Sequence, residues 1–282
     1  MLRPNICKRR EGFDMPINYL LKDGKNKALT MSYDDGNYDG DKRLIGIFNK
    51  YGIKGTFHLN GKHYVPGGDL YDKIDELREL YKGHEISMHS FNHPFLERLP
   101  KSEVVRELQK DKETLEMLAG YPVRGMSYPS GTYSDEVIEV LDMLDIKYSR
   151  TVNSTNCLIF PEKFTEWHPT MHHNGPMNEK LEQMVNSPSK TIRLLYIWGH
   201  SYEFNRPETK RTWEEMEAFC KEAGSHKEIW FATNIEIYDY CQAMRRIEVS
   251  ADRKMFFNPS AMPVWIDCEG ETVKLEPGVT RI

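Results

Sequence analysis

Short apolar runs alternate with amphipathic segments along most of the chain. Apolar runs of strand length occur at 28–33, 54–59, 85–89, 123–128, 146–151, 191–198 and 228–232. Between them, apolar residues recur every three or four positions, which predicts helices over 42–51, 70–81, 102–119, 213–222 and 235–244, and one that begins near Ser134. Ser102 and Ser134 are expected N-caps, and Gly52, Gly83 and Gly120 are expected to stop the preceding helices.

Strands that alternate with helices predict βα units around a parallel sheet. About seven units can be counted, which favours a closed barrel over a small open sheet and assigns residues 1–246 to it. After Arg246 the pattern changes to short alternating runs on either side of Glu269-Gly270. This pattern predicts a small β-hairpin appendage over 247–282. The long irregular stretch 152–176 is expected to be functional, because long loops in compact domains usually are.

The amino-acid composition indicates a globular protein and argues against several kinds of partner. Hydrophobic residues make up 39% of the 282 and charged residues 29%, which is typical of a globular chain with a sizeable core. The formal net charge of −5 argues against a general nucleic-acid or anionic-membrane partner, and no apolar run is long enough for a membrane span.

Two features of the sequence bear on the cellular compartment of the protein. Residues 1–10 are charged without a following apolar run, unlike a secretory leader. The five cysteines (Cys7, Cys157, Cys220, Cys241 and Cys268) are scattered and odd in number, which argues against a disulfide framework or a thiolate zinc site. We therefore expect a cytoplasmic protein, or a secreted one if a leader was removed.

Polar residues gather where the predicted strands end, and parallel βα folds place their sites at those ends. The residues concerned are Asp34, Asp35, His89, His93, Ser130, Arg150 and His200. One carboxylate and two imidazoles suit Zn²⁺ or another divalent transition metal, with positions left for water. Pro94, as the expected start of a helix, would let both histidines face one mouth. Each feature alone is more often a solvated turn or an unrelated histidine, but their shared location favours a metal site.

Four segments resemble the motifs of the NodB-like polysaccharide deacetylases. Ser32-Tyr33-Asp34-Asp35-Gly36 resembles the first motif, T-[FY]-D-D-G, and His89-Ser90-Phe91-Asn92-His93-Pro94 matches the second, H-[ST]-x-x-H-P. Ser127-Tyr128-Pro129-Ser130-Gly131 is similar to the third, R-x-P-x-G, without its arginine. Trp198-Gly199-His200 stands where L-x-H is expected. The resemblance spans residues 28–232 and implies a distorted (β/α)7 barrel, in agreement with the count of units.

The resemblance also implies a role for each site residue. Asp35, His89 and His93 would bind Zn²⁺, or Co²⁺, Ni²⁺ or Mn²⁺. Asp34 would be the general base and His200 the general acid that protonates the leaving amine. The backbone near Tyr128 and Ser130 would hold the oxyanion, and Trp198 would line a pocket for the acetyl methyl group.

Two departures from the family pattern leave alternatives open. Ser127 occupies the place of the arginine that pairs with the base aspartate. Arg150, at the mouth end of the next strand, is a better substitute than Arg124, but it could equally cap a surface loop. The usual fourth motif, an Asp near a Trp, is absent.

The segment 165–173 lies in the long loop instead. Trp167 could stack on a sugar, and His172 or His173 could touch substrate. Packing within the loop is the alternative for all three. His58, His63, His84 and His226 are expected to be structural.

These features predict a metal-dependent hydrolase that removes acetyl groups from N-acetylated sugars or a polysaccharide, by hydrolysis of a non-peptide C–N bond. A carbohydrate substrate is the expected partner. One alternative is an amidohydrolase or O-acetyl esterase that acts on a small intracellular substrate. Another is a catalytically silent carbohydrate-binding barrel, against which the presence of both Asp34 and His200 argues.

Overall fold

The computed structural model describes residues 17–282 apart from Ser189, Pro207 and Thr209. The described chain forms two compact units. The larger contains residues 27–188 and 193–239, and the smaller contains 17–26, 190–192 and 240–282. Cys7 and the N-terminal segment 1–10, which entered the expectations about disulfides and targeting, lie outside the described residues.

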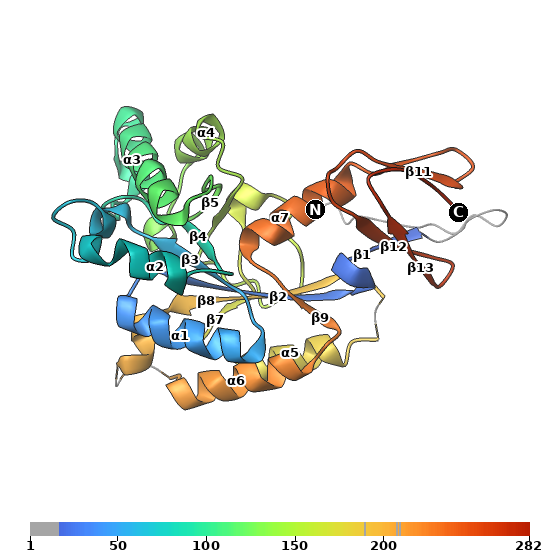
Figure 1. Ribbon diagram of the computed structural model, residues 1–282, viewed down its shortest axis with the longest axis horizontal. Helices are drawn as coiled ribbons and strands as arrows, with labels where there is room; N and C mark the ends of the chain where they lie inside the picture. Colours follow the sequence, from blue (N-terminus) through green and yellow to red (C-terminus); the bar gives the residue numbers. More distant parts are fainter. Residues whose placement is uncertain (1–16, 189, 207, 209) are drawn as a thin grey trace. The chain divides into compact units, whose positions relative to one another are not determined.

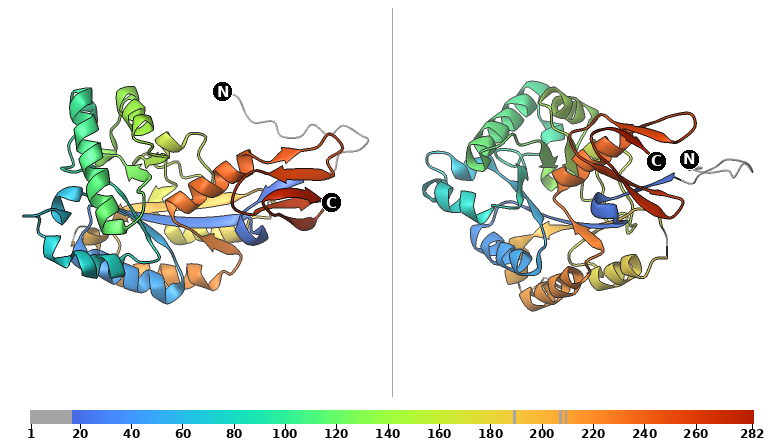
Figure 2. Two further views of the ribbon diagram at one scale, coloured as in Figure 1. Left: turned by 45° about the horizontal axis from the view of Figure 1, so that its top comes forward. Right: turned by 45° about the vertical axis from the view of Figure 1, so that its right-hand side comes forward.

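Parallel strands form the centre of the larger unit. They are β2 (Lys27–Asp34), β3 (Gly55–Leu59), β4 (Glu85–Met88), β5 (Gly125–Ser127), β6 (Tyr148–Arg150), β7 (Met171–His172), β8 (Arg193–His200) and β9 (Ile229–Phe231). The helices are α1 (Tyr38–Tyr51), α2 (Ile74–Leu80), α3 (Lys101–Ala119), α4 (Asp135–Met143), α5 (Met177–Val185), α6 (Trp213–Ser225) and α7 (Asn234–Arg245), the last of which runs on past the boundary of this unit. Helices α1 to α6 surround the sheet (Figures 1 and 2).

The strands follow the order β6-β5-β4-β3-β2-β8-β7, and β9 pairs with the first residues of β2. The segment from Trp167 to His173 joins β6 to β8 and so closes the sheet into a barrel. Trp167 bridges to Arg150 of β6, and the His173 amide donates to the Trp198 carbonyl of β8 at 2.8 Å. The predicted distorted (β/α)7 barrel is therefore confirmed, with the two-residue strand β7 as the closing piece.

All seven predicted strands are present, whereas β7 and α5 were not predicted. Strand β7 is too short to show a periodicity, so its sequence cannot be told from a loop. Ser134 caps α4 by accepting from the Val137 amide, as expected. The other expected cap, Ser102, is wrong because α3 already begins at Lys101 behind Pro100. Pro94 does not begin a helix; the next helical turn is the short 3₁₀ segment Leu96–Arg98.

The interior of the barrel is polar near the first residues of the strands. The hydrophobic core lies between the sheet and the surrounding helices. Apolar residues of the helices, such as Leu44, Phe48 and Leu115, pack on the outside of the sheet. Inside, Glu85 of β4 accepts hydrogen bonds from the Tyr148 hydroxyl of β6 at 2.7 Å and the Thr56 hydroxyl of β3 at 2.9 Å. These bonds cross between strands that are not all neighbours, so the side chains point into the barrel.

The smaller unit consists of two three-stranded antiparallel sheets. One has the order β1-β12-β13 and the other β10-β11-β14. The strands are β1 (Ile17–Leu20), β10 (Glu248–Val249), β11 (Met255–Asn258), β12 (Val264–Cys268), β13 (Glu271–Leu275) and β14 (Gly278–Arg281). The predicted hairpin around Glu269-Gly270 is confirmed as β12 and β13. Its extra partner β1 comes from the start of the described chain, too far away in sequence for a local pattern to reveal.

The described residues also bear on two expectations from composition. Cys157, Cys220, Cys241 and Cys268, the cysteines within the described residues, are all free thiols. In the same part of the chain, no helix combines the length and apolar character that a bilayer crossing requires.

Candidate active site

Sharp turns at the ends of β2 and β4 present the candidate metal ligands. Asp34 ends β2, and Asp35 follows with a φ of 74° before Gly36 at 68°. After β4, Ser90 and His93 both have a φ of 63°. Left-handed conformations at residues other than glycine cost on the order of 1–3 kcal/mol each and tend to cluster at functional sites. Here three of them turn the chain back so that Asp35, His89 and His93 meet.

The three predicted ligands do converge. Oδ1 of Asp35 lies 3.5 Å from Nε2 of His89 and 3.8 Å from Nε2 of His93. Together they form one of the two clusters found in the described residues that could hold a metal ion. One carboxylate oxygen and two imidazole nitrogens, partly open to solvent, fit a divalent transition metal with free coordination positions.

Ser127 orients one of these ligands. The Ser127 carbonyl lies 2.9 Å from Nδ1 of His89 and can only accept, so Nδ1 carries the proton. The lone pair of His89 is then on Nε2, which faces Asp35. The Ser127 hydroxyl is 2.7 Å from the same Nδ1 and donates to Oδ1 of Asp34 at 3.2 Å. Ser127, which stands where the third motif has its arginine, thus orients a candidate metal ligand from behind.

Arg150 lies directly against Asp34. Its guanidinium forms an ion pair with Oδ2 of Asp34, and the two side chains are 0% and 3% exposed. The sequence left open whether Arg150 faces Asp34 or caps a surface loop, and the structure places it at Asp34. Burial alone would raise the pKa of Asp34, but Arg150 and then His89 outweigh burial and hold that pKa well below its usual range. The other candidate, Arg124, pairs with Asp239 instead.

His200 stands on the other side of Asp35 and has a carboxylate partner. Its Nε2 is 3.9 Å from Oδ2 of Asp35, and its Nδ1 is 3.3 Å from Oε1 of Glu203. Burial acts to lower the pKa of His200, but Glu203 and the two aspartates raise it above its ordinary value. The histidine is thereby favoured in its protonated form, which can donate a proton. Glu203 stands three residues beyond His200, in a short 3₁₀ helix (Ser201–Asn205) that carried no sequence signal.

Glu203 also gathers the two histidines of the long loop. Its Oε2 is 3.1 Å from Nε2 of His172 and 2.8 Å from Nε2 of His173. His173 is fully buried and packs where Gly199 has no side chain; a Cβ there would lie 2.1 Å from Nδ1 of His173. His173 therefore cannot touch substrate, whereas His172 keeps some exposure. His172, His200 and Glu203 form the second possible metal cluster of the described residues.

The predicted substrate residues divide into two groups. Ser130 is exposed, with a φ of 56°, and Trp198 packs over the Arg150 guanidinium at 4.4 Å. Tyr128 does not fit the expected contact, because its amide already donates to the Arg150 carbonyl and its hydroxyl to the Thr165 carbonyl. Trp167 is 1% exposed and packs edge-on against aromatic rings of the barrel, so the expected stacking on a sugar is wrong.

Two further residues support the ligands and were missed in the sequence. The Tyr202 hydroxyl donates to Oδ2 of Asp35 at 3.1 Å. Buried Asp111 of α3 accepts from the Gly61 amide at 2.7 Å and the His89 amide at 3.2 Å, which ties α3 to the ligand loop. Asp35, Tyr38 and Tyr202 are among the residues that line a cavity of about 250 Å³.

Comparison with known proteins agrees with this geometry. The polysaccharide deacetylase family model matches residues 21–149, which include Asp34, Asp35, His89 and His93. Residues 21–149 of this chain therefore resemble the polysaccharide deacetylase family. The expected family resemblance is thereby confirmed.

The sequence match covers only part of each curated relative. A chitin deacetylase of Arthroderma benhamiae is 32% identical over 125 residues, which are 44% of this chain and 32% of the relative. A peptidoglycan-N-acetylglucosamine deacetylase of Listeria monocytogenes is 26% identical over 146 residues, 51% of this chain and 30% of the relative. The chain thus spans about a third of the length of these curated relatives.

Solved structures share the fold at low identity. A Mycobacterium smegmatis protein assigned to the polysaccharide deacetylases superposes with a TM-score of 0.61 at 17% identity, over 83% of this chain and 96% of that chain. A family 4 acetyl xylan esterase of Clostridium thermocellum, solved with a cobalt ion, has a TM-score of 0.52 at 17% identity, over 75% and 90%.

Proposed function

We propose that this chain is a metal-dependent deacetylase that hydrolyses the N-acetyl groups of acetylated sugars. The observation that carries the proposal is the meeting of three groups at one end of the barrel. These are the ligand set Asp35, His89 and His93, the ionised Asp34 beside it, and the protonated His200 opposite. The match of residues 21–149 to the polysaccharide deacetylase family model supports the substrate class.

The ligand set fits a divalent transition metal such as Zn²⁺ or Co²⁺, by the chemistry of its donors and by the proton that Ser127 keeps on the far nitrogen of His89. When bound, such an ion supplies Lewis-acid activation of water and of the acyl carbonyl. The protein holds its ligand atoms within 4.8 Å of one another and supports two of the ligands from behind through Ser127 and Tyr202.

Asp34 is the general base in this proposal. Its carboxylate stays ionised because Arg150 faces it inside the barrel, so it can accept a proton from the attacking water over the whole neutral range. The Ser127 hydroxyl fixes the second carboxylate oxygen. The base Asp34 and the ligand Asp35 are adjacent in sequence, and they diverge because Asp34 ends the strand and Asp35 begins the turn.

His200 is the general acid. Glu203 holds Nδ1, so Nε2 is the nitrogen that points past Asp35 toward the position of the leaving amine. An amide nitrogen leaves poorly unless it is protonated, so the elevated pKa of His200 serves this step. Trp198, which packs on Arg150, and the exposed Ser130 would contact the acetyl group and its oxyanion.

The test is acetate release from N-acetylglucosamine oligomers by chelator-stripped protein, before and after addition of Zn²⁺ or Co²⁺. We expect turnover only with metal, and a loss of at least about 100-fold in Asp34→Asn and in His200→Gln with metal content unchanged. Arg124→Met is the matched control, because Arg124 forms an ion pair remote from the cluster. Metal-loaded wild-type protein that releases no acetate from these oligomers would overturn the proposal.

A further inference from the structure

A buried carboxyl group contacts the turn that follows His200. Asp41 lies on the first turn of α1 and is 0% exposed. Its Oδ1 accepts a hydrogen bond from the Ser201 hydroxyl at 2.5 Å, and its Oδ2 accepts one from the Tyr81 hydroxyl at 2.8 Å. Burial raises the pKa of Asp41 to about 7, while the two hydroxyls act to lower it. A carboxyl group in such surroundings costs free energy that an apolar side chain would not.

The Ser201 contact fixes a turn that carries three groups of the candidate site. Ser201 begins the short 3₁₀ helix that follows His200. In the same turn the Tyr202 hydroxyl donates to Asp35 at 3.1 Å, and Glu203 lies 3.3 Å from Nδ1 of His200. The Tyr202 ring stacks on the His200 imidazole, with centroids 5.0 Å apart. A shift of Ser201 would therefore displace His200 relative to Asp35.

Helix α1 and this turn pack closely against each other. A Cβ on Gly40 would lie 2.6 Å from the Ser201 hydroxyl oxygen and 3.0 Å from the Ser201 carbonyl carbon, so there is no room for a side chain. Asn37 caps α1 by accepting from the Gly40 amide at 2.9 Å, only two residues after Asp35. Asp41 thus connects the turn that carries Asp35 with the turn that follows His200.

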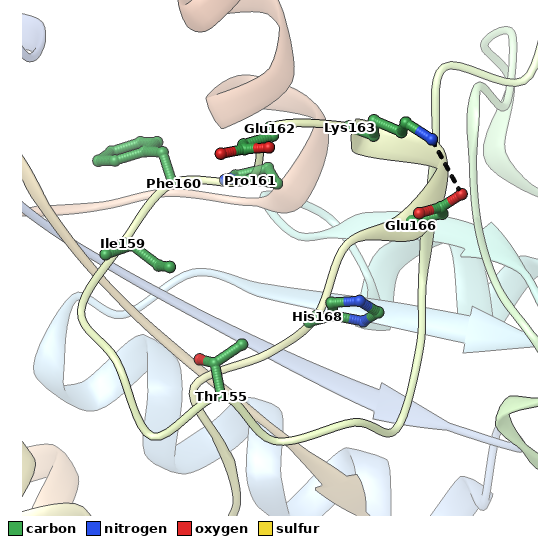
Figure 3. A pocket seen from close by; sticks show the side chains of 8 residues that line it. All are labelled: Thr155, Ile159, Phe160, Pro161, Glu162, Lys163, Glu166 and His168. Carbon is green, nitrogen blue, oxygen red and sulfur yellow. Dashed lines mark hydrogen bonds and ion pairs between the residues drawn. The ribbon is translucent and has the colours of Figure 1, made fainter. Parts of the chain in front are cut away.

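Asp41 cannot touch substrate, because no part of it is exposed. It lines neither the cavity of about 250 Å³ that includes Asp35 nor the cavity of about 270 Å³ in the segment that joins β6 to β7, whose lining residues Figure 3 shows. Any effect of Asp41 on the reaction must therefore pass through the position of the turn that it contacts.

We propose that Asp41 is a positioning residue that holds the turn after β8 so that His200 faces the leaving amine. The inference rests on the proposed function, in which His200 is the general acid. A general acid must lie within about 2.6–3.2 Å of the atom that it protonates. A misplacement of about 1 Å can cost about 100-fold in rate. The hydrogen bonds of Asp41 then control the protonation of the leaving group without a contact to substrate or metal.

The test compares an amide with an activated ester. Acetate release from N-acetylglucosamine oligomers needs a proton on the leaving amine, whereas 4-nitrophenolate leaves 4-nitrophenyl acetate without one. We expect Asp41→Ala to lower kcat for the amide by about 10- to 100-fold, with KM, metal content and the ester rate little changed. Ser201→Ala removes only one hydroxyl and should act in the same direction by less. Asp41→Asn can still bond to both hydroxyls and should retain wild-type rates.

A matched control and a structural measurement complete the test. Glu85→Gln changes another buried carboxyl group, at the first residue of β4, and should leave the ratio of amide to ester rates as in wild type. Crystal structures of the metal-free proteins give the distance from Nε2 of His200 to Oδ2 of Asp35, which is 3.9 Å here. We expect this distance to change by about 1 Å in Asp41→Ala and to stay the same in Asp41→Asn.

Equal losses on amide and ester in Asp41→Ala would show that Asp41 only stabilises the fold. An unchanged distance in that variant would overturn the proposal whatever the rates. If Asp41→Ala does not fold, Ser201→Ala decides by the same two criteria. Metal-loaded wild-type protein that releases no acetate from the oligomers would remove the proposed function alone, and the distance would then decide whether Asp41 positions His200.

Discussion

Replacing Arg150 with Met removes the cation that faces Asp34 while retaining much of the side-chain volume. The two groups are 0% and 3% exposed, so water cannot take the place of the guanidinium. Removing one partner of a buried ion pair typically costs about 3–5 kcal/mol of unfolding free energy, because the other charge stays buried without compensation. We expect a loss of this size in Arg150→Met.

The same change acts on the pKa of Asp34. Burial raises that pKa and Arg150 is the largest influence that lowers it, so the carboxyl becomes harder to ionise in the variant. One pKa unit corresponds to about 1.4 kcal/mol, so a loss of about 3–5 kcal/mol from the ionised form is equivalent to about two to four pH units. Because the base works only when ionised, the acid limb of the pH–rate profile should move upward by about that much.

The assay is kcat/KM for acetate release between pH 4 and 9, with metal content measured on each sample. Arg150→Lys keeps a charge but lacks the planar fork, and we expect an intermediate shift. Arg124→Met breaks an arginine–aspartate pair whose side chains are 34% and 29% exposed. It should cost at most about 1 kcal/mol and leave the acid limb in place.

An unchanged acid limb in a folded, metal-loaded Arg150→Met protein would refute the assignment of Asp34 as an ionised base dependent on Arg150. An equal shift in Arg124→Met would refute it as well, because the effect would then follow from general destabilisation.

Three more outcomes are expected. His93→Ala should weaken zinc affinity by more than about 100-fold by elemental analysis after dialysis, whereas His226→Ala, in a polar turn, should retain one ion per chain. Glu203→Gln should lower the pKa of His200 and move the alkaline limb of the pH–rate profile down by about one unit, because the acid must stay protonated. Burial raises the pKa of Glu85 to about 7, so the stability that its proton contributes is complete below about pH 4.5 and is lost as pH rises to about 7. Glu85→Gln should remove this loss, worth about 3 kcal/mol, in urea denaturation at the two pH values.

For each of these three predictions, one outcome would contradict the reasoning. Tight zinc binding by His93→Ala would mean that another set of residues holds the metal. An alkaline limb that stays in place in Glu203→Gln would mean that Glu203 does not control His200. Equal pH dependence of stability in wild type and Glu85→Gln would mean that Glu85 is ionised throughout.

Much of the barrel could be predicted because its signals are local. Seven apolar runs and the helices between them appear as periodic patterns, and each pattern depends on residues within one element. The candidate ligands Asp35, His89 and His93 could be found in the same way, since each lies in a turn that follows a strand and parallel strands end at one face. Trp167 shows where this reasoning fails. An aromatic residue in a long loop can stack on substrate or on the core, and only its neighbours Tyr148 and Tyr196 decide which.

The sequence by itself determined the βα alternation and pointed to the candidate ligands and the aspartate beside them, because hydrophobic period and motif spacing are written along the chain. The tertiary structure decided which groups surround them. Arg150 meets Asp34 across 116 residues, and Ser127 meets both His89 and Asp34 from a third strand. Glu203 is close to His200 in sequence, but its contact depends on an irregular turn. Such contacts arise when barrel closure brings distant strand ends together, and no local pattern records which side chains then face one another.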